Sequence, residues 1–463
     1  MLPRWLLMAV LSGTMIGCTS TEIRNPTRDS AHETRLSNGL RVIVKEDHRA
    51  PVVVSQIWYR VGAVDEPQGL TGISHVLEHM MFKGTGKLGP NEFSRIVSEN
   101  GGRDNAFTSS DYTAYYEQLE KSRLPVAFEL EADRMHNLKL AAAEFDKEVR
   151  VVMEERRLRT DDQPDSLAYE KFMATAFTTH PYRNPVIGWM PDLEKLKVTD
   201  LSAWYQRHYA PNNATLVVVG DVVPAEVVAL AQKYFGDIPA YPLSPATIPS
   251  EPQQTETRRV RVQAPAEVPA VFIGFHVPAA QDGAAGREAW AIQVLAGVLD
   301  GGDAARFARE LIRGQRVAAS VDTGYDWNAR YPTAMVFQGT PANGRSVEDL
   351  EKAILAQIAR LHTEPVSDDE LARVKAQVAA QNVFQRDSTF YQAMAIGQLA
   401  VAGLDWRMLD RYVDSINAVT AADVQAVARK YLVESNMTVA VLDPLPIDPK
   451  RPPRAGTGGG HVR

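Results

Sequence analysis

Two histidines and a glutamate within residues 72–82 have the types and the spacing needed for metal-dependent hydrolysis. His75, Glu78 and His79 lie among apolar residues in a pattern that predicts a helix. Side chains three and four residues apart share a helical face, so both imidazoles can bind one ion while Glu78 lies beside it. Two neutral imidazoles suit Zn²⁺, and a neighbouring carboxylate that is not a ligand can accept a proton from an activated water. The order His-x-x-Glu-His therefore predicts a catalytic zinc site.

A tetrahedral zinc ion with one open position requires a third protein ligand. The single cysteine of the chain, Cys18, belongs to its N-terminal segment, so we expect no thiolate ligand. The best source of a carboxylate is the strongly helical stretch 143–159, in which Glu148 and Glu155 are two turns apart and share a face. Glu154 in the same stretch is interpreted as part of a solvated face, the usual position of a Glu-Glu-Arg-Arg run.

Strands are predicted on both sides of this helix along the chain. Residues 51–60 are rich in valine and aromatic residues, and residues 103–117 alternate as a β-hairpin does. Between them, Pro90 and Gly101-Gly102 bracket a second helix.

The sequence also contains an internal duplication. Residues 269–276 resemble residues 51–58 at an offset of 218 (269 − 51), and residues 429–438 resemble 207–215 at offsets of 222 (429 − 207) and 223 (438 − 215). A nearly constant offset indicates two copies of one α+β domain. The helix expected at 286–300 in the second copy contains no histidine, so this copy has lost the metal site.

The length of 463 residues fits two domains better than one. Residues 238–257 hold five prolines and little that could pack, which predicts an interdomain linker. We therefore expect an N-terminal zinc-binding domain at 34–237, an inactive C-terminal domain at 258–443 and a disordered tail at 444–463.

The N-terminal segment 1–18 predicts a signal peptide. Arg4 precedes the apolar run 5–17, which ends in Met15-Ile16-Gly17-Cys18 and resembles the lipobox of bacterial lipoproteins. We expect a lipidated Cys18, a flexible tether at 19–33, and a location in the bacterial periplasm with a lipid anchor to the outer membrane. An ordinary secretory signal or a short membrane anchor is the alternative. The formal net charge of −7, without a basic stripe, gives no reason to expect a nucleic-acid partner.

Four motifs make the chain resemble one family of peptidases. They are His75-x-x-Glu78-His79, the pair Glu148 and Glu155, Gly101-Gly102-x-x-Asn105-Ala106-x-Thr108, and His180-Pro181-Tyr182 followed by Gly188. From about Glu33 to Asp443, the chain resembles the pitrilysin, insulysin and mitochondrial processing peptidase family of zinc metallopeptidases. The resemblance implies an α+β fold of two homologous domains, each a mainly antiparallel sheet packed with helices, that form a clam-like pair around a chamber.

The resemblance assigns roles to the residues of the metal site. It implies one Zn²⁺ per chain, bound by His75, His79 and Glu155, with Glu78 as the general base. Glu148 would support the ligands as a further residue of the catalytic site. Phe82 would line the pocket beside the scissile bond, although a core position is an equally good interpretation.

The resemblance also points to substrate contacts. In the family, a peptide adds as a strand to the edge that corresponds to Asn105-Ala106-Phe107, and an ordinary edge strand is the alternative. Family members stabilise the oxyanion with an Arg and a Tyr, seven residues apart, in the second domain. Arg313 matches the Arg, but the Tyr position falls on Ala319 or Ser320, and the nearest downstream tyrosine is Tyr325.

Three interpretations of function follow. The first is a zinc-dependent endopeptidase that hydrolyses unstructured peptides, or processes a protein substrate, in the periplasm. The second is a metal-bearing subunit that is active only in a heterodimer with a homologous partner subunit; the missing Tyr favours this interpretation, and a homodimer is the competing arrangement. The third is a catalytically silent binding subunit, against which the intact His75, Glu78, His79 and Glu155 argue.

Overall fold

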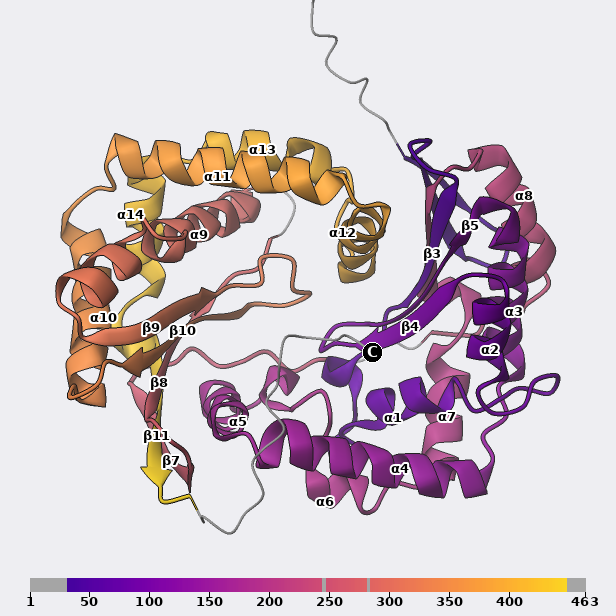
Figure 1. The fold of residues 1–463 in the computed structure, drawn as a ribbon, viewed down its shortest axis with the longest axis horizontal. Coiled ribbons are helices and arrows are strands. Elements are labelled where there is room, and N and C mark those ends of the chain that lie inside the picture. Colours follow the sequence, from indigo (N-terminus) through magenta and orange to yellow (C-terminus); the bar gives the residue numbers. More distant parts are fainter. Residues whose placement is uncertain (1–30, 244–246, 281–283, 448–463) are drawn as a thin grey trace, which may run out of the picture. The chain divides into compact units, whose positions relative to one another are not determined.

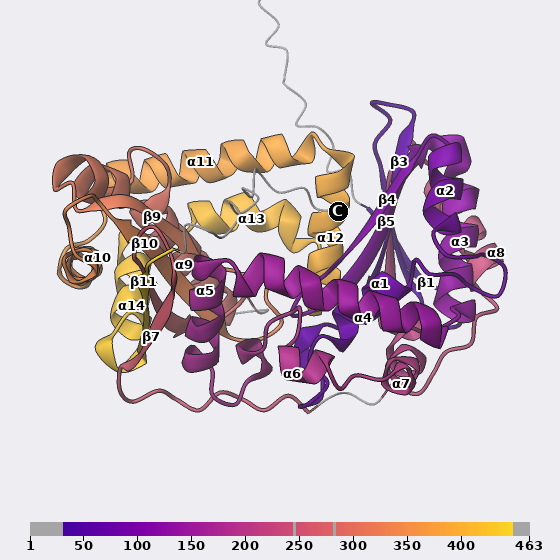
Figure 2. The same cartoon turned by 60° about the horizontal axis from the view of Figure 1, so that its bottom comes forward.

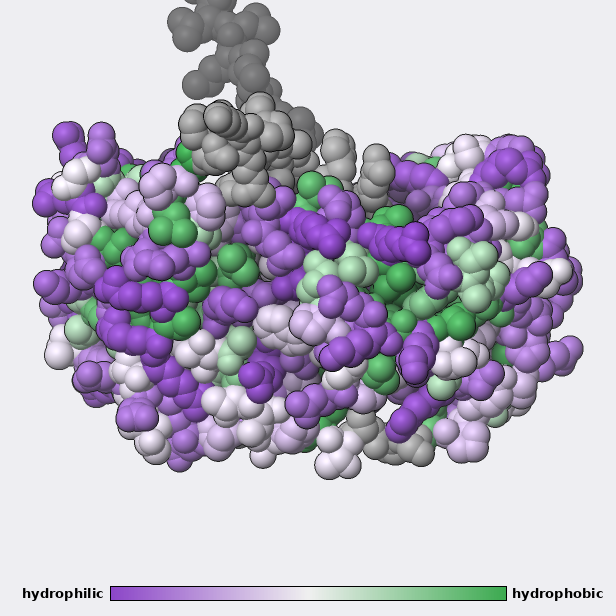
Figure 3. All heavy atoms as spheres, turned by 90° about the horizontal axis from the view of Figure 1, so that it is seen from below, coloured by the Kyte–Doolittle hydropathy of each residue, from purple (hydrophilic) through white to green (hydrophobic). Residues whose placement is uncertain are grey.

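The computed structural model of the chain describes residues 31–243, 247–280 and 284–447. The expected signal peptide at 1–18, its lipidation site Cys18 and most of the expected tether lie outside these residues, as does most of the expected C-terminal tail. No helix among the described residues combines the length and the apolar character that crossing a bilayer requires. On the face drawn in Figure 3, hydrophobic residues form separate patches between hydrophilic ones.

The N-terminal domain is built on a six-stranded sheet in the order β1-β2-β6-β3-β5-β4 (Figure 1). Its strands are β1 (His32–Arg35), β2 (Arg41–Glu46), β3 (Val52–Tyr59), β4 (Arg103–Thr108), β5 (Thr113–Glu120) and β6 (Ala214–Gly220). Strands β2 and β6 are parallel, and every other neighbouring pair is antiparallel. Because β4 ends this order, one of its two edges has no partner strand among the described residues.

Alternate residues of this sheet face two different helical layers, as the two-residue period of a strand requires. One face packs into a core with helices of the same domain. These helices are α1 (Ile73–Met80), α2 (Glu92–Glu99), α3 (Leu124–Asn137), α4 (Ala142–Arg156), α7 (Val198–His208) and α8 (Pro224–Phe235). The opposite face, which includes Val54 and Trp58, packs against α12 (Thr389–Ala402), a helix of the second half of the chain.

The C-terminal domain repeats this plan with a five-stranded sheet in the order β7-β11-β8-β10-β9. Its strands are β7 (Arg258–Pro265), β8 (Ala270–Val277), β9 (Ala318–Gly324), β10 (Thr333–Pro341) and β11 (Met437–Leu445). One face packs against helices of the second half. These helices are α9 (Ala284–Asp300), α10 (Val347–Thr363), α11 (Asp368–Arg386), α13 (Met408–Asn417) and α14 (Ala421–Tyr431). The other face packs against α5 (Pro164–Ala176), a helix of the first half, which lies beside this sheet in Figures 1 and 2.

The close packing of these two exchanged helices depends on glycine. A Cβ atom at Gly397 of α12 would lie 2.1 Å from the ring of Trp58 on β3. Similarly, a Cβ atom at Gly274 of β8 would lie 2.3 Å from the ring of Phe172 on α5. Each domain therefore covers one face of the other domain's sheet, and a side chain at either glycine would force a helix away from it.

The two sheets confirm the predicted fold class of two homologous α+β domains. Without β1, the strand order of the N-terminal sheet is β2-β6-β3-β5-β4. This order corresponds strand by strand to that of the C-terminal sheet, and the parallel pair lies at the same end of both sheets. The starts of β3 and β8 are 218 residues apart (270 − 52), and those of β6 and β11 are 223 apart (437 − 214). The helix that corresponds to α1 is α9, which contains no histidine.

The ends of the domains differ in detail from the sequence-based boundaries. Strand β1 begins at His32, inside the expected tether, because it pairs with β2. Strand β11 continues through Pro444 and Leu445, inside the expected tail, because it pairs with β7. The described residues of 238–257 contain no helix or strand, but Glu251 accepts hydrogen bonds from the backbone N–H groups of residues 178–180. This part of the linker is therefore fixed to the N-terminal domain.

Candidate metal centre

The N-terminus of α1 is held by a buried carboxylate. Glu66 accepts hydrogen bonds from the backbone N–H groups of Gly72, at 2.8 Å, and Ser74, at 2.9 Å. Burial raises the pKa of Glu66 to about 7, against the effect of these two hydrogen bonds. The first N–H groups of a helix have no partner within it, so Glu66 satisfies two of them and fixes the position of α1.

The two histidines of α1 and one glutamate of α4 converge on one point. The rings of His75 and His79 lie 4.9 Å apart. Glu155 Oε2 lies 3.8 Å from His75 Nε2 and 3.4 Å from His79 Nε2. Two ligand atoms of a tetrahedral zinc ion, each about 2.0–2.1 Å from the metal, are about 3.3 Å apart. The two distances to Glu155 are close to this value, and the three ligand atoms all lie within 4.8 Å of one another, so the three side chains can converge on one zinc ion.

Glu148 lies behind His79 and not among the converging ligand atoms. Its Oε2 is 3.3 Å from His79 Nδ1, and its Oε1 accepts a hydrogen bond from Lys83 Nζ at 2.9 Å. A carboxylate in this place fixes the ring and keeps Nε2 free for a metal. Glu148 thus contacts the ring of His79 and is not one of the three converging groups. His75 has no such support, because its Nδ1 atom is buried and has no hydrogen-bond partner among the described residues.

The electrostatics of the three groups suit a cation. Burial and the neighbouring His79 lower the pKa of His75 to about 4. Burial also disfavours the charged form of His79, but its contacts with Glu148 and Glu155 raise its pKa to about 9. Burial alone would raise the pKa of Glu155, yet the two histidines and Arg159 hold it below its usual value. His79 therefore carries a proton beside the negative charge of Glu155 at neutral pH, and a Zn²⁺ ion bound there would take the place of that proton.

Glu78 lies beside this group and is oriented by a different element. Its Oε2 accepts a hydrogen bond of 2.6 Å from the hydroxyl of Thr108, at the end of β4. Burial raises the pKa of Glu78, although this hydrogen bond and the neighbouring His79 oppose the shift. A carboxylate with a raised pKa next to a metal site can accept a proton from a water molecule and release it again.

The structure also shows residues around the site that the sequence did not indicate. Arg159 binds Glu155 Oε1 at 2.6 Å from a wide helical turn that continues α4. Arg156 is buried, pairs with Glu170 of α5 at 2.7 Å, and donates a hydrogen bond to the carbonyl of Gly188. The spacing of four residues between Glu155 and Arg159 was a usable signal for that ion pair. No local pattern marks Arg156 or Glu66.

The predicted substrate edge lies next to this site. Asn105, Ala106 and Phe107 belong to β4, the edge strand that ends at Thr108. The backbone N–H of Ala106 donates to the side chain of Asn105, at 2.9 Å. Phe107 is partly buried against Trp58, with ring centroids 5.5 Å apart. Because Thr108 at the end of β4 donates a hydrogen bond to Glu78, the open edge of this strand lies beside Glu78.

Phe82 packs toward the interior of the N-terminal domain. Its ring centroid is 6.0 Å from that of Phe93 and 6.3 Å from that of Tyr115, and the guanidinium of Arg134 lies 5.2 Å from it. These contacts agree with the core interpretation of Phe82.

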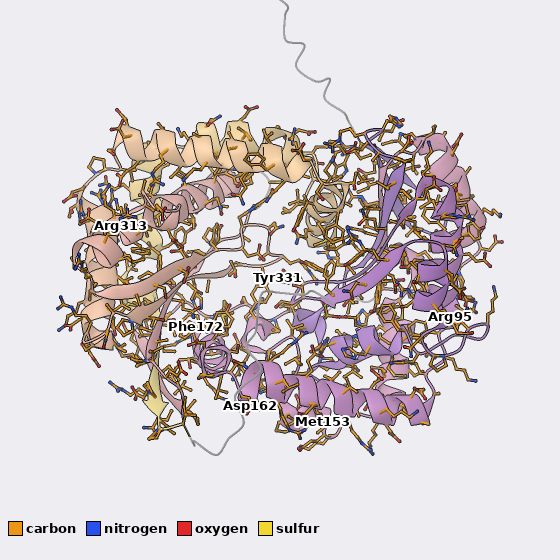
Figure 4. All side chains as sticks on the ribbon, viewed as in Figure 1. Arg95, Met153, Asp162, Phe172, Arg313 and Tyr331 are labelled. Carbon is orange, nitrogen blue, oxygen red and sulfur yellow. The ribbon has the colours of Figure 1, made fainter. Side chains whose placement is uncertain are left out.

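The residues expected for the oxyanion are not brought to the metal ligands. Arg313, labelled in Figure 4, is exposed and donates a hydrogen bond to the backbone carbonyl of Asp303. Ala319 and Ser320 lie on β9, and the hydroxyl of Tyr325 donates to the carbonyl of Pro278 at 2.6 Å. No ion pair or hydrogen bond among the described residues joins any of these side chains to the metal ligands.

A different arginine of the C-terminal domain reaches the N-terminal domain. Arg330 binds Asp65 with contacts of 2.8 and 3.2 Å, and its backbone N–H donates to Asp111 at 2.9 Å. The hydroxyl of Tyr182, from the His-Pro-Tyr motif, also donates to Asp111. The side chains of Arg330 and Asp65 are each 6% exposed, so this is a buried ionic contact between the domains.

Comparisons with known proteins agree with this arrangement. Residues 41–189 match the family model described as Insulinase (Peptidase family M16), and residues 195–378 match the model described as Peptidase M16 inactive domain. The chain is 31% identical, over 89% of its length and 93% of the relative, to the zinc protease PqqE of Helicobacter pylori. It is 26% identical, over 88% of both chains, to the mitochondrial-processing peptidase subunit beta of Lentinula edodes.

Solved structures show the same fold. The crystal structure of a protease from Helicobacter pylori has a TM-score of 0.85 and 29% identity, and covers 90% of this chain and 100% of that chain. The periplasmic protease PqqL of Escherichia coli has a TM-score of 0.75 and 17% identity, and covers 92% of this chain and 49% of that chain. With these relatives, the two matched domains and the converging His75, His79 and Glu155, the chain belongs to peptidase family M16, the insulinase family, whose relatives include zinc proteases.

Proposed function

We propose that this chain is a zinc-dependent endopeptidase. The observation that carries the proposal is the convergence of His75, His79 and Glu155 beside a carboxylate that is not a ligand, Glu78. Bound there, Zn²⁺ would lower the pKa of a water molecule and polarise the carbonyl of a peptide bond. Zinc is the metal that this donor set favours, at one ion per chain.

The remaining chemistry belongs to side chains of this protein. Glu78 accepts the proton of the attacking water at a carboxylate oxygen and passes it to the leaving amine. Thr108 orients Glu78 through their hydrogen bond. Glu148 and Lys83 hold His79 in the orientation that presents Nε2.

Strand β4 gives the substrate its geometry. A peptide that adds to the open edge at Asn105, Ala106 and Phe107 forms backbone hydrogen bonds and extends past Thr108 toward Glu78. An edge strand accepts any chain that can lie extended, so the expected substrates are unstructured peptides or an unfolded segment of a protein. Stably folded proteins should resist cleavage.

The test is peptide cleavage by the purified chain alone. A quenched fluorescent peptide without structure should be cleaved, a chelator should abolish the activity, and added Zn²⁺ should restore it. His79→Ala should contain no bound zinc and should stay inactive when zinc is added. Cleavage that persists after complete removal of metal would exclude the proposal.

A second candidate is an active site that needs a homologous partner subunit. Two observations favour it: Arg313 binds Asp303, and no tyrosine occupies the positions of Ala319 and Ser320. Without a preorganised donor for the oxyanion, the lone chain should be slow by about 10²–10³-fold. The partner would carry the missing Arg and Tyr and lack the His-x-x-Glu-His helix.

Light scattering and mixing distinguish these arrangements. A heterodimer predicts that adding the partner raises peptide cleavage at least ~10²-fold. A homodimer predicts twice the chain mass and full activity without any other protein. If the lone monomeric chain cleaves peptides as fast as any mixture, the partner proposal is wrong.

We also propose that the protein is a periplasmic lipoprotein, anchored to the outer membrane through Cys18. The proposal rests on the Met15-Ile16-Gly17-Cys18 sequence, which lies outside the described residues. The wild-type protein should fractionate with membranes, and Cys18→Ala should be released as a soluble periplasmic species. A wild-type protein that is wholly soluble, with its N-terminus cut elsewhere, would contradict this.

A further inference from the structure

A cavity of about 570 Å³ is bounded by the segment that follows β4 and by a side chain that binds the metal centre. Ser110, two residues beyond the end of β4, lies on its wall, and so does Arg159. Arg159 pairs with Glu155, the third group of the metal centre, at 2.6 Å. Tyr169 of α5 and Phe272 of β8 also line the cavity, and its volume is within the range of ligand sites. A peptide that adds to β4 and continues past the end of that strand therefore meets this cavity and Arg159.

Three cations are paired around the metal centre, and they differ in exposure. Lys83 binds Glu148 and its side chain is 18% exposed, whereas the side chain of Arg156 binds Glu170 and is 5% exposed. The side chain of Arg159 is 63% exposed. Of these three cations, Arg159 is the one that lines the cavity. It is therefore the cation that a bound peptide can reach.

The ion pair of Arg159 does not by itself explain its position. An exposed ion pair between residues four apart contributes little to stability. Arg159 belongs to a wide helical turn, Arg157–Asp161, of a kind that is frequent at functional sites and that ends beside Asp162 in Figure 4. A guanidinium has five N–H donors, and one carboxylate does not use all of them. Burial has the largest effect on the pKa of His75 and of Glu78, but the charge of Arg159 lowers both, so this charge acts across the site.

We propose that Arg159 is a catalytic residue of this chain, which donates hydrogen bonds to the carbonyl oxygen of the scissile bond as negative charge develops there. A fixed cation at that place stabilises the transition state more than the bound substrate. Arg313 of the C-terminal domain does not supply this charge, because it binds the carbonyl of Asp303. With Arg159 as the donor, the lone chain needs no partner for this step. This role of Arg159 rests on the peptidase function proposed above.

Steady-state peptide cleavage by the full chain at saturating zinc tests this role. Arg159→Gln should lower kcat about 10²–10³-fold, the usual effect of removing one such donor. Its KM should change less than ~3-fold, because the carbonyl oxygen of the substrate carries no charge before the reaction. Arg159→Lys keeps a positive charge and should be at least ~10-fold faster than Arg159→Gln. Arg157→Gln, on the same turn at a side chain that is 49% exposed, is the matched control and should keep the wild-type kcat.

A phosphinic peptide, whose tetrahedral phosphorus carries a negative oxygen as the transition state does, gives a measurement that does not depend on turnover. By calorimetric titration, Arg159→Gln should bind it more weakly by the same factor as the loss of kcat/KM. If Arg159 only supported Glu155, the zinc affinity of Arg159→Gln would fall and its kcat at saturating zinc would not. That result, or unchanged binding of the phosphinic peptide, would overturn the role of Arg159 alone. A wild-type chain that neither cleaves peptides nor binds the phosphinic peptide would overturn the peptidase function as well.

Discussion

Replacing Glu148 by Gln separates a positioning carboxylate from a metal ligand. The side chain of Glu148 is 11% exposed and bridges His79 Nδ1 and Lys83 Nζ. A glutamine keeps the volume, but it removes the charge and offers an N–H₂ group to one of these two partners. Losing such a support lowers metal affinity about 10–100-fold, or about 1.4–2.7 kcal/mol, whereas losing a ligand costs much more.

The assay is competition for Zn²⁺ with a chromophoric chelator at fixed pH, with circular dichroism to check the fold. The zinc affinity of Glu148→Gln should lie between that of the wild type and that of Glu155→Gln, which removes a ligand. Glu154→Gln is the matched control on the same helix, because Glu154 is 58% exposed and, in the described part of the chain, pairs only with Arg157. If Glu148→Gln loses as much affinity as Glu155→Gln, Glu148 is a ligand; if it loses none, the contact with His79 has no effect.

Three further predictions concern other parts of the molecule. Glu78→Gln should bind zinc normally but cleave peptides at least ~10²-fold more slowly, because an amide cannot accept the proton of water; turnover and metal content measure this. Arg330→Met should destabilise the protein by about 3–5 kcal/mol in urea, because it leaves Asp65 buried without its cation, and adding Asp65→Asn should recover part of this loss. Burial opposes ionisation of Glu251, but its backbone hydrogen bonds prevail and lower its pKa from 4.5 to about 2. The ionised carboxylate therefore stabilises the fold fully above about pH 4.5, and this contribution is lost as the pH falls through 2. The difference in Tm between the wild type and Glu251→Gln should therefore shrink over that interval.

Each of these predictions has an outcome that contradicts it. Wild-type turnover in Glu78→Gln would exclude the assignment of the general base. An unchanged urea midpoint in Arg330→Met would mean that the interdomain ion pair contributes nothing to folding. A Tm difference for Glu251→Gln that stays constant from pH 5 to pH 2 would mean that the carboxylate titrates alike in the folded and unfolded chain.

The sequence predicted those features that depend on a regular spacing. The helical period placed His75, Glu78 and His79 on one face, and the two-turn separation of Glu148 and Glu155 placed both carboxylates near that face. The constant offset between repeats predicted two sheets of one topology, because equivalent strands must occupy equivalent places in two copies of a fold.

Contacts that depend on the path of the backbone could not be predicted from residue spacing. Glu66 caps α1 after a non-helical turn, and Arg330 binds Asp65 from the other half of the chain, and no periodic sequence pattern indicates either contact. Helix α12 did carry a signal. It contains no charged residue, which is typical of a helix buried on more than one side, as it is against Trp58.

The exchange of covering helices connects the metal site to the contact between the domains. Glu155 is near the end of α4, which continues through one wide turn into α5, and α5 covers the sheet of the C-terminal domain. Arg156, the residue after the ligand, joins these elements because it binds Glu170 on α5 and the carbonyl of Gly188. The backbone of Gly188 lies directly against Gly72, at the start of the histidine helix. The end of α4 that carries Glu155 and the start of the histidine helix are therefore both connected, through Arg156 and Gly188, to the helix that covers the C-terminal sheet.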